Sequence, residues 1–245
     1  MKTMTGASMI GLAFLLAACG GGAGNEANPA KVPEQLQRIA APNNGDWTQV
    51  VARSAEGFVM GNPNAPVKLV EYASITCGHC AEFAEQGGAR LREYVKTGQV
   101  SWEYRPFQIF PTDPGIFMLL RCQGPEAFFA TSDQLYATQS EWAGRAQTAL
   151  QSQQSQLEQM SPTQRAAAIT RAAGMDEFFR QRGMPAAQVS QCLGNMAEIQ
   201  ALQAISDRAG REEGVTGTPT FLINGEEAEG AGTWRALEPM IQARL

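Results

Sequence analysis

A Cys-x-x-Cys motif between a predicted strand and a predicted helix is the feature that most constrains the fold of this chain. Residues 67–73 (VKLVEYA) are mostly apolar, which is typical of a central strand covered on both faces. The motif Cys77-Gly78-His79-Cys80 follows this strand, and apolar residues then recur at helical spacing until Thr97-Gly98. Residues 100–107 (VSWEYRPF) predict a second strand. Strand, helix and strand within about forty residues make a βαβ unit, so the two strands should run parallel.

The rest of the chain divides into a helical part and a mixed part. Residues 113–213 are rich in Ala, Gln, Leu, Arg and Glu and poor in strand formers, which predicts several short helices. One short strand is predicted at residues 58–60 and another at residues 218–223, where the following Asn224-Gly225 favours a hairpin. Residues 234–245 predict a last amphipathic helix. The pattern indicates an α/β domain into which a block of helices is inserted.

The position of the motif predicts different chemistry for its two cysteines. The thiol of Cys77 would lie at the N-terminus of the helix, where unpaired backbone N–H groups and the helix dipole favour a thiolate. His79 should add to that stabilisation when it is protonated or donates a hydrogen bond. We therefore predict a pKa for Cys77 below the roughly 8.5 of a free thiol. Cys80, one turn inside the helix, should be more buried and act as the resolving cysteine.

Other uses of such a motif fit this sequence less well. A zinc site would need two more ligands, and Cys122 and Cys192 form no second motif. Haem attachment needs a histidine directly after the second cysteine, where this chain has Ala81. A structural disulfide across so short a loop would constrain little entropy of the unfolded chain. Redox chemistry is therefore favoured, and we expect neither a metal nor an organic cofactor.

The N-terminus has the pattern of an exported lipoprotein. Lys2 precedes an apolar run, residues 9–16, that is too short to span a bilayer by itself. The sequence Leu-Ala-Ala-Cys that ends at Cys19 resembles the bacterial lipobox, in which the cysteine is lipidated and becomes the mature N-terminus. We predict a lipoprotein signal peptide over residues 1–18, with an ordinary signal peptide and a chance cysteine as the alternative. Residues 19–45, rich in Gly, Ala, Asn and Pro, predict a flexible tether.

These features predict a folded domain that is anchored to a membrane in the periplasm by lipid. Gly20 rather than Asp follows the cysteine, and by resemblance to the lipoprotein sorting pattern of Gram-negative bacteria this favours the outer membrane. If Cys19 is acylated, four cysteines remain, an even number that is typical of disulfide bonding in exported chains and allows three pairings. A net charge of −5 without a basic run argues against a nucleic-acid binder.

Several of these patterns together resemble one known family. The turn at residues 61–66 (GNPNAP), the CGHC motif, the helical insertion and Thr218-Pro219 are similar to those of DsbA-like thiol-disulfide oxidoreductases of the thioredoxin fold, over about residues 57–245. The resemblance implies a thioredoxin-like fold with an inserted all-helical domain. In these terms, the thioredoxin-like domain comprises residues 46–112 and 214–245, and the inserted helical domain comprises residues 113–213.

The same resemblance implies roles for three further residues. Pro219 would be a cis-proline that faces the motif, and the backbone of Thr218 would pair with the substrate peptide; a trans proline at the start of an edge strand is the alternative. Glu71 lies in the apolar strand, and the resemblance implies that it relays protons to the buried cysteine. Desolvation should raise the pKa of Glu71. The alternative is a carboxylate that faces out of the sheet and is solvated.

The other two cysteines lie seventy positions apart and bracket most of the helical block. We favour a structural disulfide between Cys122 and Cys192 over a second redox pair, because neither has the helix-start environment of the CGHC motif. In the chain-entropy model, closing a loop of that size stabilises the folded state by roughly 4 kcal/mol.

The resemblance implies an enzyme that introduces disulfide bonds into exported proteins through Cys77 and Cys80. Its partners would be unfolded or reduced exported proteins and a membrane oxidase of the DsbB type, and we expect a monomer. Gly-His between the cysteines is typical of eukaryotic disulfide isomerases, whose reduction potentials are near −180 mV. The most oxidising DsbA members carry Pro-His and have reduction potentials near −120 mV. Thr218 is also typical of isomerase and reductase branches. We therefore expect a milder oxidant, with an isomerase or reductase, or a non-catalytic peptide-binding lipoprotein, as alternatives.

Overall fold

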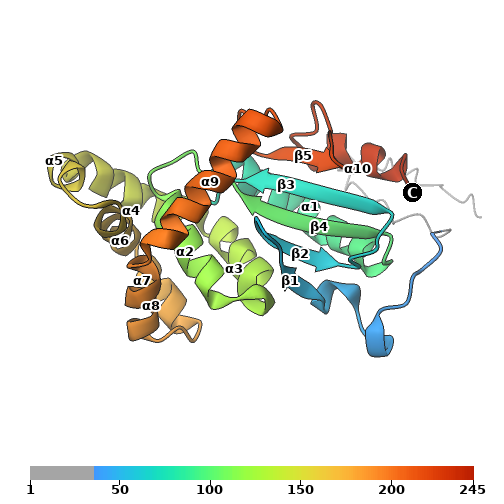
Figure 1. Ribbon diagram of the computed structural model, residues 1–245, viewed down its shortest axis with the longest axis horizontal. Helices are drawn as coiled ribbons and strands as arrows, with labels where there is room; N and C mark the ends of the chain where they lie inside the picture. Colours follow the sequence, from blue (N-terminus) through green and yellow to red (C-terminus); the bar gives the residue numbers. More distant parts are fainter. Residues whose placement is uncertain (1–35) are drawn as a thin grey trace, which may run out of the picture. The chain divides into compact units, whose positions relative to one another are not determined.

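The six strands form one sheet with the order β1-β2-β4-β3-β5-β6 (Figure 1), and the CGHC motif follows β3, one of its central strands. The computed structural model describes residues 36–245, so the predicted signal peptide, Cys19 and tether residues 19–35 lie outside the described residues. The strands are β1 (Val51–Arg53), β2 (Phe58–Gly61), β3 (Val67–Ala73), β4 (Val100–Pro106), β5 (Thr220–Ile223) and β6 (Glu226–Glu227). β3 and β4 run parallel, which confirms the predicted βαβ unit, and the other neighbouring strands are antiparallel.

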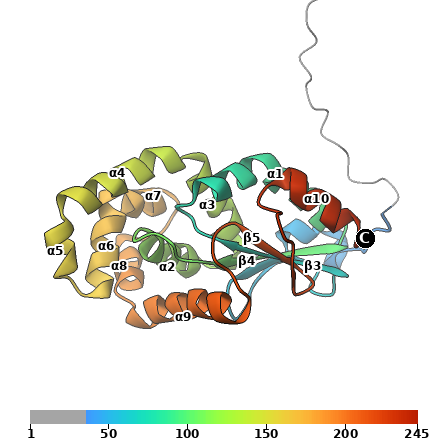
Figure 2. The same cartoon turned by 90° about the horizontal axis from the view of Figure 1, so that it is seen from above.

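Helices cover both faces of this sheet. The helices are α1 (Gly78–Lys96), α2 (Asp113–Gln123), α3 (Pro125–Ala137), α4 (Gln139–Ser152), α5 (Gln154–Glu158), α6 (Pro162–Ala172), α7 (Met175–Gln181), α8 (Ala186–Leu193), α9 (Met196–Glu212) and α10 (Trp234–Gln242). α1 and α10 lie on one face and α9 lies along the other (Figure 2). α1 approaches α10 closely at Gly87, where an added Cβ would lie 2.8 Å from the ring of Trp234. Glycine is therefore required at this contact.

Alternation along β3 distributes its side chains between two cores. Leu69 and Ala73 belong to the large core under α1, whereas Tyr72 belongs to a smaller core with Ile205 and Ala209 of α9. Successive side chains of a strand point to opposite faces, so Glu71 lies on the α1 face together with Leu69 and Ala73. This places a carboxyl group on the same side of the sheet as the helix that carries the motif.

The predicted helical block is α2–α9, and it follows β4 and precedes β5 in the chain. Its helices pack around α2, whose middle residues Ile116, Phe117, Leu119 and Leu120 are fully buried. The same apolar cluster includes residues of the sheet, so the helices and the sheet share a core. The architecture is an α/β thioredoxin-like fold with a helical insertion, as the resemblance implied.

The structure adds detail at the ends of the described residues. β1 was not predicted, and α10 ends at Gln242 rather than at the last residue. Residues 36–45, the end of the predicted tether, are in contact with the folded part: the backbone of Ile39 donates to Thr97 at 2.8 Å and accepts from Trp47 Nε1 at 2.8 Å. Within residues 36–245, no helix combines the length and the apolar character that crossing a membrane requires.

Candidate active site

The two cysteines of the motif lie at the start of α1, as expected from the strand-to-helix pattern. Cys77 is the N-cap residue of the helix and Cys80 lies in its first turn. Both are free thiols, and their exposed fractions are 6% and 0%. The pair is thus covered by protein, with Cys77 the more accessible of the two.

The surroundings of Cys77 stabilise its thiolate. They lower its pKa to about 5, through a hydrogen bond from the Cys80 thiol first of all. Partial burial opposes this, while the side chain of Thr218 and the backbone N–H groups of Cys80 and His79 lower the pKa further. Those N–H groups belong to the first turn of the helix, where they have no partner within the helix. The result is a thiol that is ionised at neutral pH.

His79 lies in the first turn of α1, between the two cysteines. Its side chain is exposed, and its backbone N–H helps to lower the pKa of Cys77. The effect of its imidazole on the thiolate stays a prediction.

Cys80 has the opposite environment. Burial, first of all, raises its pKa well above the usual value, and its hydrogen bond to Cys77 together with the charges of Cys77 and Glu71 raises it further. Cys80 therefore holds its proton under conditions in which Cys77 has lost its own. This asymmetry gives the two sulfur atoms separate roles in exchange chemistry.

Thr218 and Pro219 face Cys77 from the loop that leads into β5. The peptide bond between them is cis, and the Cys77 Sγ lies 3.3 Å from the carbonyl oxygen of Thr218, to which it donates in its protonated form. The structure thus brings together the two segments, 141 positions apart, that the resemblance assigned to one site.

Glu71 lies in the interior of the protein and not on a solvated face of the sheet. Its exposed fraction is 2%, and its Oε2 accepts a hydrogen bond from Trp102 Nε1 at 2.9 Å. Burial raises the pKa of Glu71 to about 8, with the Trp102 hydrogen bond acting in the opposite direction. Because the charge of Glu71 also raises the pKa of Cys80, the two groups interact electrostatically. A carboxyl group with a pKa near neutrality can donate or accept a proton at physiological pH.

Asp113 organises the approach to the motif, and sequence reasoning missed it. This fully buried carboxylate accepts from Ser74 Oγ at 2.9 Å and from Thr76 Oγ1 at 2.8 Å, just before Cys77 in the chain. It also accepts from the backbone N–H groups of Ile109 and Phe110, each at 2.9 Å. Asp113 thereby joins the loop before α1 to the loop before α2. The sequence did show an Asp followed by Pro, which is typical of a helix start. It could not show that Asp113 binds Ser74 and Thr76, because these residues lie in a distant segment.

Two further side chains that the sequence did not indicate support the same loop. The hydroxyl groups of Tyr104 and Tyr136 lie 2.8 Å apart, and Tyr136 donates to the carbonyl oxygen of Ser74 at 3.2 Å. Gln139 Nε2 donates to the carbonyl oxygen of Cys77 at 2.9 Å. Tyr136 and Gln139 belong to the helical block, so this block contributes directly to the position of the redox pair.

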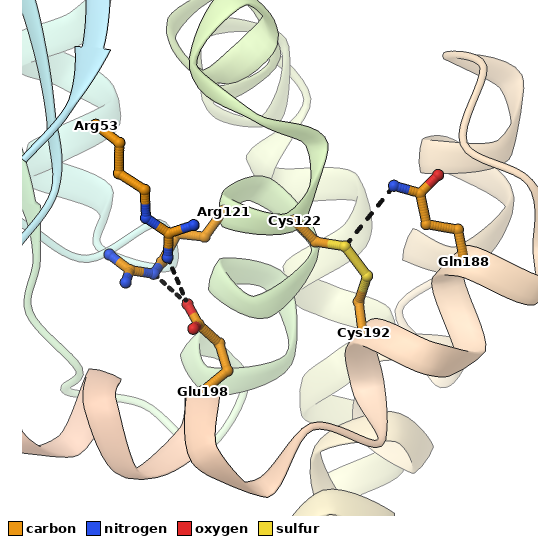
Figure 3. The surroundings of a disulfide bond; sticks show 6 residues. All are labelled: Arg53, Arg121, Cys122, Gln188, Cys192 and Glu198. Carbon is orange, nitrogen blue, oxygen red and sulfur yellow. Dashed lines mark hydrogen bonds and ion pairs between the residues drawn. A yellow bond between two sulfur atoms is a disulfide. The ribbon is translucent and has the colours of Figure 1, made fainter.

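Within residues 36–245, the other two cysteines lie away from this site. Cys122 at the end of α2 and Cys192 in α8 are joined by a disulfide (Figure 3). Next to it, Arg121 forms an ion pair with Glu198 of α9, and Gln188 lies 3.9 Å from the sulfur of Cys122. Because these cysteines bond to each other, they are not available as zinc ligands for the CGHC motif. In the described part of the chain, no three His, Cys, Asp or Glu side chains gather as a metal site.

Comparisons with known proteins agree with this geometry. A family model described as Thioredoxin matches residues 53–243. The crystal structure of a protein-disulfide isomerase from Novosphingobium aromaticivorans superimposes with a TM-score of 0.72 and 31% sequence identity, covering 76% of this chain and 95% of that one. That of Wolbachia pipientis alpha-DsbA1 has a TM-score of 0.61 at 17% identity, covering 79% and 92% of the two chains, and so shows the shared fold alone.

A curated relative extends the comparison to sequence. A candidate protein-disulfide oxidoreductase of Rickettsia prowazekii is 24% identical over 174 residues, which cover 70% of this chain and 56% of the relative. The match thus spans little more than half of the length of that relative. The family model, the fold and these relatives point to one family. The chain belongs to the thioredoxin family.

Proposed function

We propose that this chain oxidises pairs of thiols in exported proteins and that the Cys77–Cys80 disulfide is the bond that it transfers. The observation that carries the proposal is the asymmetry of the pair, with a Cys77 pKa of about 5 and a Cys80 pKa raised by burial. A stabilised thiolate favours the reduced protein, so the disulfide becomes a stronger oxidant. At pH 7, a Cys77 pKa of about 5 means that ionisation stabilises the reduced protein by roughly 3 kcal/mol. This raises the reduction potential of the disulfide by about 60 mV.

The first step breaks the Cys77–Cys80 bond. A substrate thiolate attacks the Sγ of Cys77, the more accessible sulfur, and forms a mixed disulfide with it. Cys80 leaves as a thiolate in a buried site that strongly favours its protonated form. Glu71, whose pKa is about 8 and which is therefore mostly protonated at pH 7, supplies the proton.

The second step releases the oxidised substrate. A second substrate thiolate attacks the substrate sulfur of the mixed disulfide, a substrate disulfide forms, and Cys77 leaves as a thiolate. Thiols of low pKa are good leaving groups, so the pKa of about 5 favours this direction of exchange. During both steps the backbone of Thr218, which lies 3.3 Å from Cys77, is placed to pair with the substrate peptide.

The cellular setting forms part of the proposal. The lipobox-like sequence that ends at Cys19 supports a lipid anchor, with the folded part in the periplasm and the outer membrane favoured. The reduced pair then needs an electron acceptor, for which we propose a membrane oxidase of the DsbB type. We propose that the protein acts as a monomer on unfolded or reduced exported proteins.

Disulfide isomerisation is the second candidate function. Two observations favour it: the Novosphingobium relative at 31% identity is named a protein-disulfide isomerase, and Gly78-His79 is the dipeptide typical of isomerases. An isomerase must be kept reduced, since it attacks existing disulfides with its Cys77 thiolate. The redox state of Cys77 and Cys80 in cells therefore separates the two functions, and predominantly free thiols would contradict the oxidase.

The oxidation of a reduced, unfolded model protein tests the proposal directly. We expect the oxidised chain to consume substrate thiols and C77S to lose about 100-fold or more of the rate, because exchange requires the Cys77 sulfur. The matched control is C122A/C192A, which removes the other disulfide and should keep the rate. Full activity of C77S would contradict every enzymatic function assigned to the motif.

A further inference from the structure

A continuous series of contacts leads from Glu71 to an ion pair between α1 and α3. Trp102 donates its indole N–H to Glu71 at 2.9 Å. The guanidinium of Arg92 in α1 lies over the Trp102 ring, 5.3 Å from its centre. Arg92 in turn donates to Asp133 Oδ2 of α3 at 2.7 Å. The indole ring thus lies between the buried carboxyl group and the ion pair.

The ion pair also borders on solvent. A groove of about 650 Å³ starts beside Cys77 at Gly78 and is lined by both Arg92 and Asp133. Its α1 side is formed largely by small residues, Ala81, Ala84 and Ala89 among them. The Asp133 side chain is 44% exposed and that of Arg92 is 22% exposed. Solvent in this groove therefore reaches the pair while Glu71 stays buried beneath the indole ring.

The titratable and charged groups around Glu71 come from three elements. α1 contributes Cys80 and Arg92, β4 contributes Tyr104, and α3 contributes Tyr136 and Asp133. Burial raises the pKa of both tyrosines well above the usual value, so they stay neutral. Arg92 and Asp133 are therefore the charges that act on Glu71 at neutral pH. Their effects have opposite signs, because the charge of Asp133 raises the pKa of Glu71 and that of Arg92 lowers it.

We propose that Arg92 and Asp133 are a positioning pair for Glu71, which holds the Trp102 indole against the carboxyl group and fixes how readily that group releases its proton. The inference rests on the proposed function in one respect, namely that the proton goes to Cys80 when its thiolate leaves Cys77. The pair acts through Trp102 and through its charges, and neither of its side chains forms a hydrogen bond with the thiols.

Substitution of either member of the pair should shift the titration midpoint of Glu71, and the two shifts should have opposite directions. In R92M the charge of Asp133 is no longer balanced, so the titration midpoint of Glu71 should rise by a few tenths of a pH unit or more. In D133N the charge of Arg92 is no longer balanced, so the midpoint should fall by a similar amount. In R92K, which keeps the positive charge, the titration midpoint of Glu71 should stay close to that of the unmodified protein. A merely structural role would destabilise the fold without opposite shifts.

The helix α1 offers a matched control. Arg90 forms an ion pair with Glu238 at 2.6 Å, with both side chains less than one fifth exposed, and Glu238 contacts Tyr94 rather than Trp102. R90M therefore removes a similar ion pair from the same helix. It should leave the titration of Glu71 unchanged.

The experiment follows Glu71 in the reduced protein by carboxyl ¹³C NMR, with E71Q to assign the signal. In parallel, the rate of reduction of the Cys77–Cys80 disulfide by glutathione is measured from pH 6 to pH 10 for each variant, per glutathione thiolate. We expect the rate to fall where Glu71 loses its proton, at higher pH in R92M and at lower pH in D133N. Shifts in the same direction, or none, would overturn the positioning role.

The two readouts separate this inference from the proposed function. Opposite NMR shifts with an unchanged rate profile would overturn the role of the pair in proton delivery. Opposite shifts in both readouts, in a protein that fails to oxidise the reduced model protein, would support the pair and contradict the oxidase function.

Discussion

At the scale of single residues, the position of Glu71 follows from simple alternation along a strand. Leu69, Glu71 and Ala73 share one face of β3, and α1 covers that face because it starts directly after the strand. Burial then raises the pKa of the carboxyl group, as the sequence predicted, and helix-start N–H groups help to lower that of Cys77. Both effects depend on local order in the chain, which is why they could be predicted.

Replacement of Glu71 by Gln should change how stability depends on pH. Burial raises the pKa of Glu71 from 4.5 to about 8, so the folded protein binds this proton more tightly than the unfolded chain. Its contribution to stability is complete below pH 4.5 and is lost as the pH rises through about 8. Over that interval, stability falls by about 1.4 kcal/mol per pH unit through this group alone. Gln keeps the acceptor for Trp102 without the ionisation.

Urea unfolding of the reduced protein between pH 5 and pH 9 measures this effect as the difference between E71Q and the unmodified chain. Because both proteins are reduced, the effect of Cys77 ionisation on the pH dependence of stability is the same in each and cancels in the difference. That effect has the opposite sign, since the Cys77 pKa is lowered in the folded state. We expect E71Q to gain relative stability steadily towards pH 8. A difference that does not depend on pH would contradict the burial of an ionisable carboxyl group at this position.

Other residues of the site could not be found in this way. Asp113, Tyr136 and Gln139 each bind a backbone group of the segment around the motif, more than 35 positions away. Examples are the Thr76 N–H, which donates to Asp113, and the Cys77 carbonyl, which accepts from Gln139. Their local sequence is that of ordinary helix starts and helix faces. Only the packing of the helical block against the motif gives them a role in the site.

At the scale of elements, the prediction was best where a pattern was long or had a clear end. β3 has the predicted bounds, and α1 ends at Lys96, directly before Thr97-Gly98. β1 is a three-residue edge strand whose pairing with β2 has no local signal, and it was missed. The helix α10 ends three residues earlier than predicted. Short or terminal elements depend on tertiary contacts more than on their own periodicity.

The disulfide between α2 and α8 should stabilise the helical block without taking part in exchange. It closes a loop with a sequence separation of 70, so C122A/C192A should lose roughly 4 kcal/mol of unfolding free energy in the chain-entropy model. Urea unfolding of the two proteins, each with an oxidised Cys77–Cys80 pair, measures the loss. An unchanged midpoint, or a loss of exchange activity in a folded variant, would contradict a structural role.

At the scale of the whole molecule, the sequence predicted which parts exist but not how they meet. The order of strands and helices indicated an inserted helical block, and the resemblance brought Thr218 and Pro219 to the motif. That α3 and α4 lie beside α1, so that Tyr136 and Gln139 reach the active-site loop, depends on packing between distant segments. Because the helical block and the sheet share one apolar core, the helices are held against the loop that carries the redox pair.

The central claim is that the structure makes the Cys77–Cys80 disulfide an oxidant, and its equilibrium with glutathione at pH 7 tests this most directly. With a Cys77 pKa of about 5 and Gly-His between the cysteines, we predict a reduction potential between about −120 and −200 mV, above that of the glutathione pool. C122A/C192A should give the same value, since its sulfur atoms lie outside the site. A potential below about −250 mV, in the range of reductases, would contradict the account.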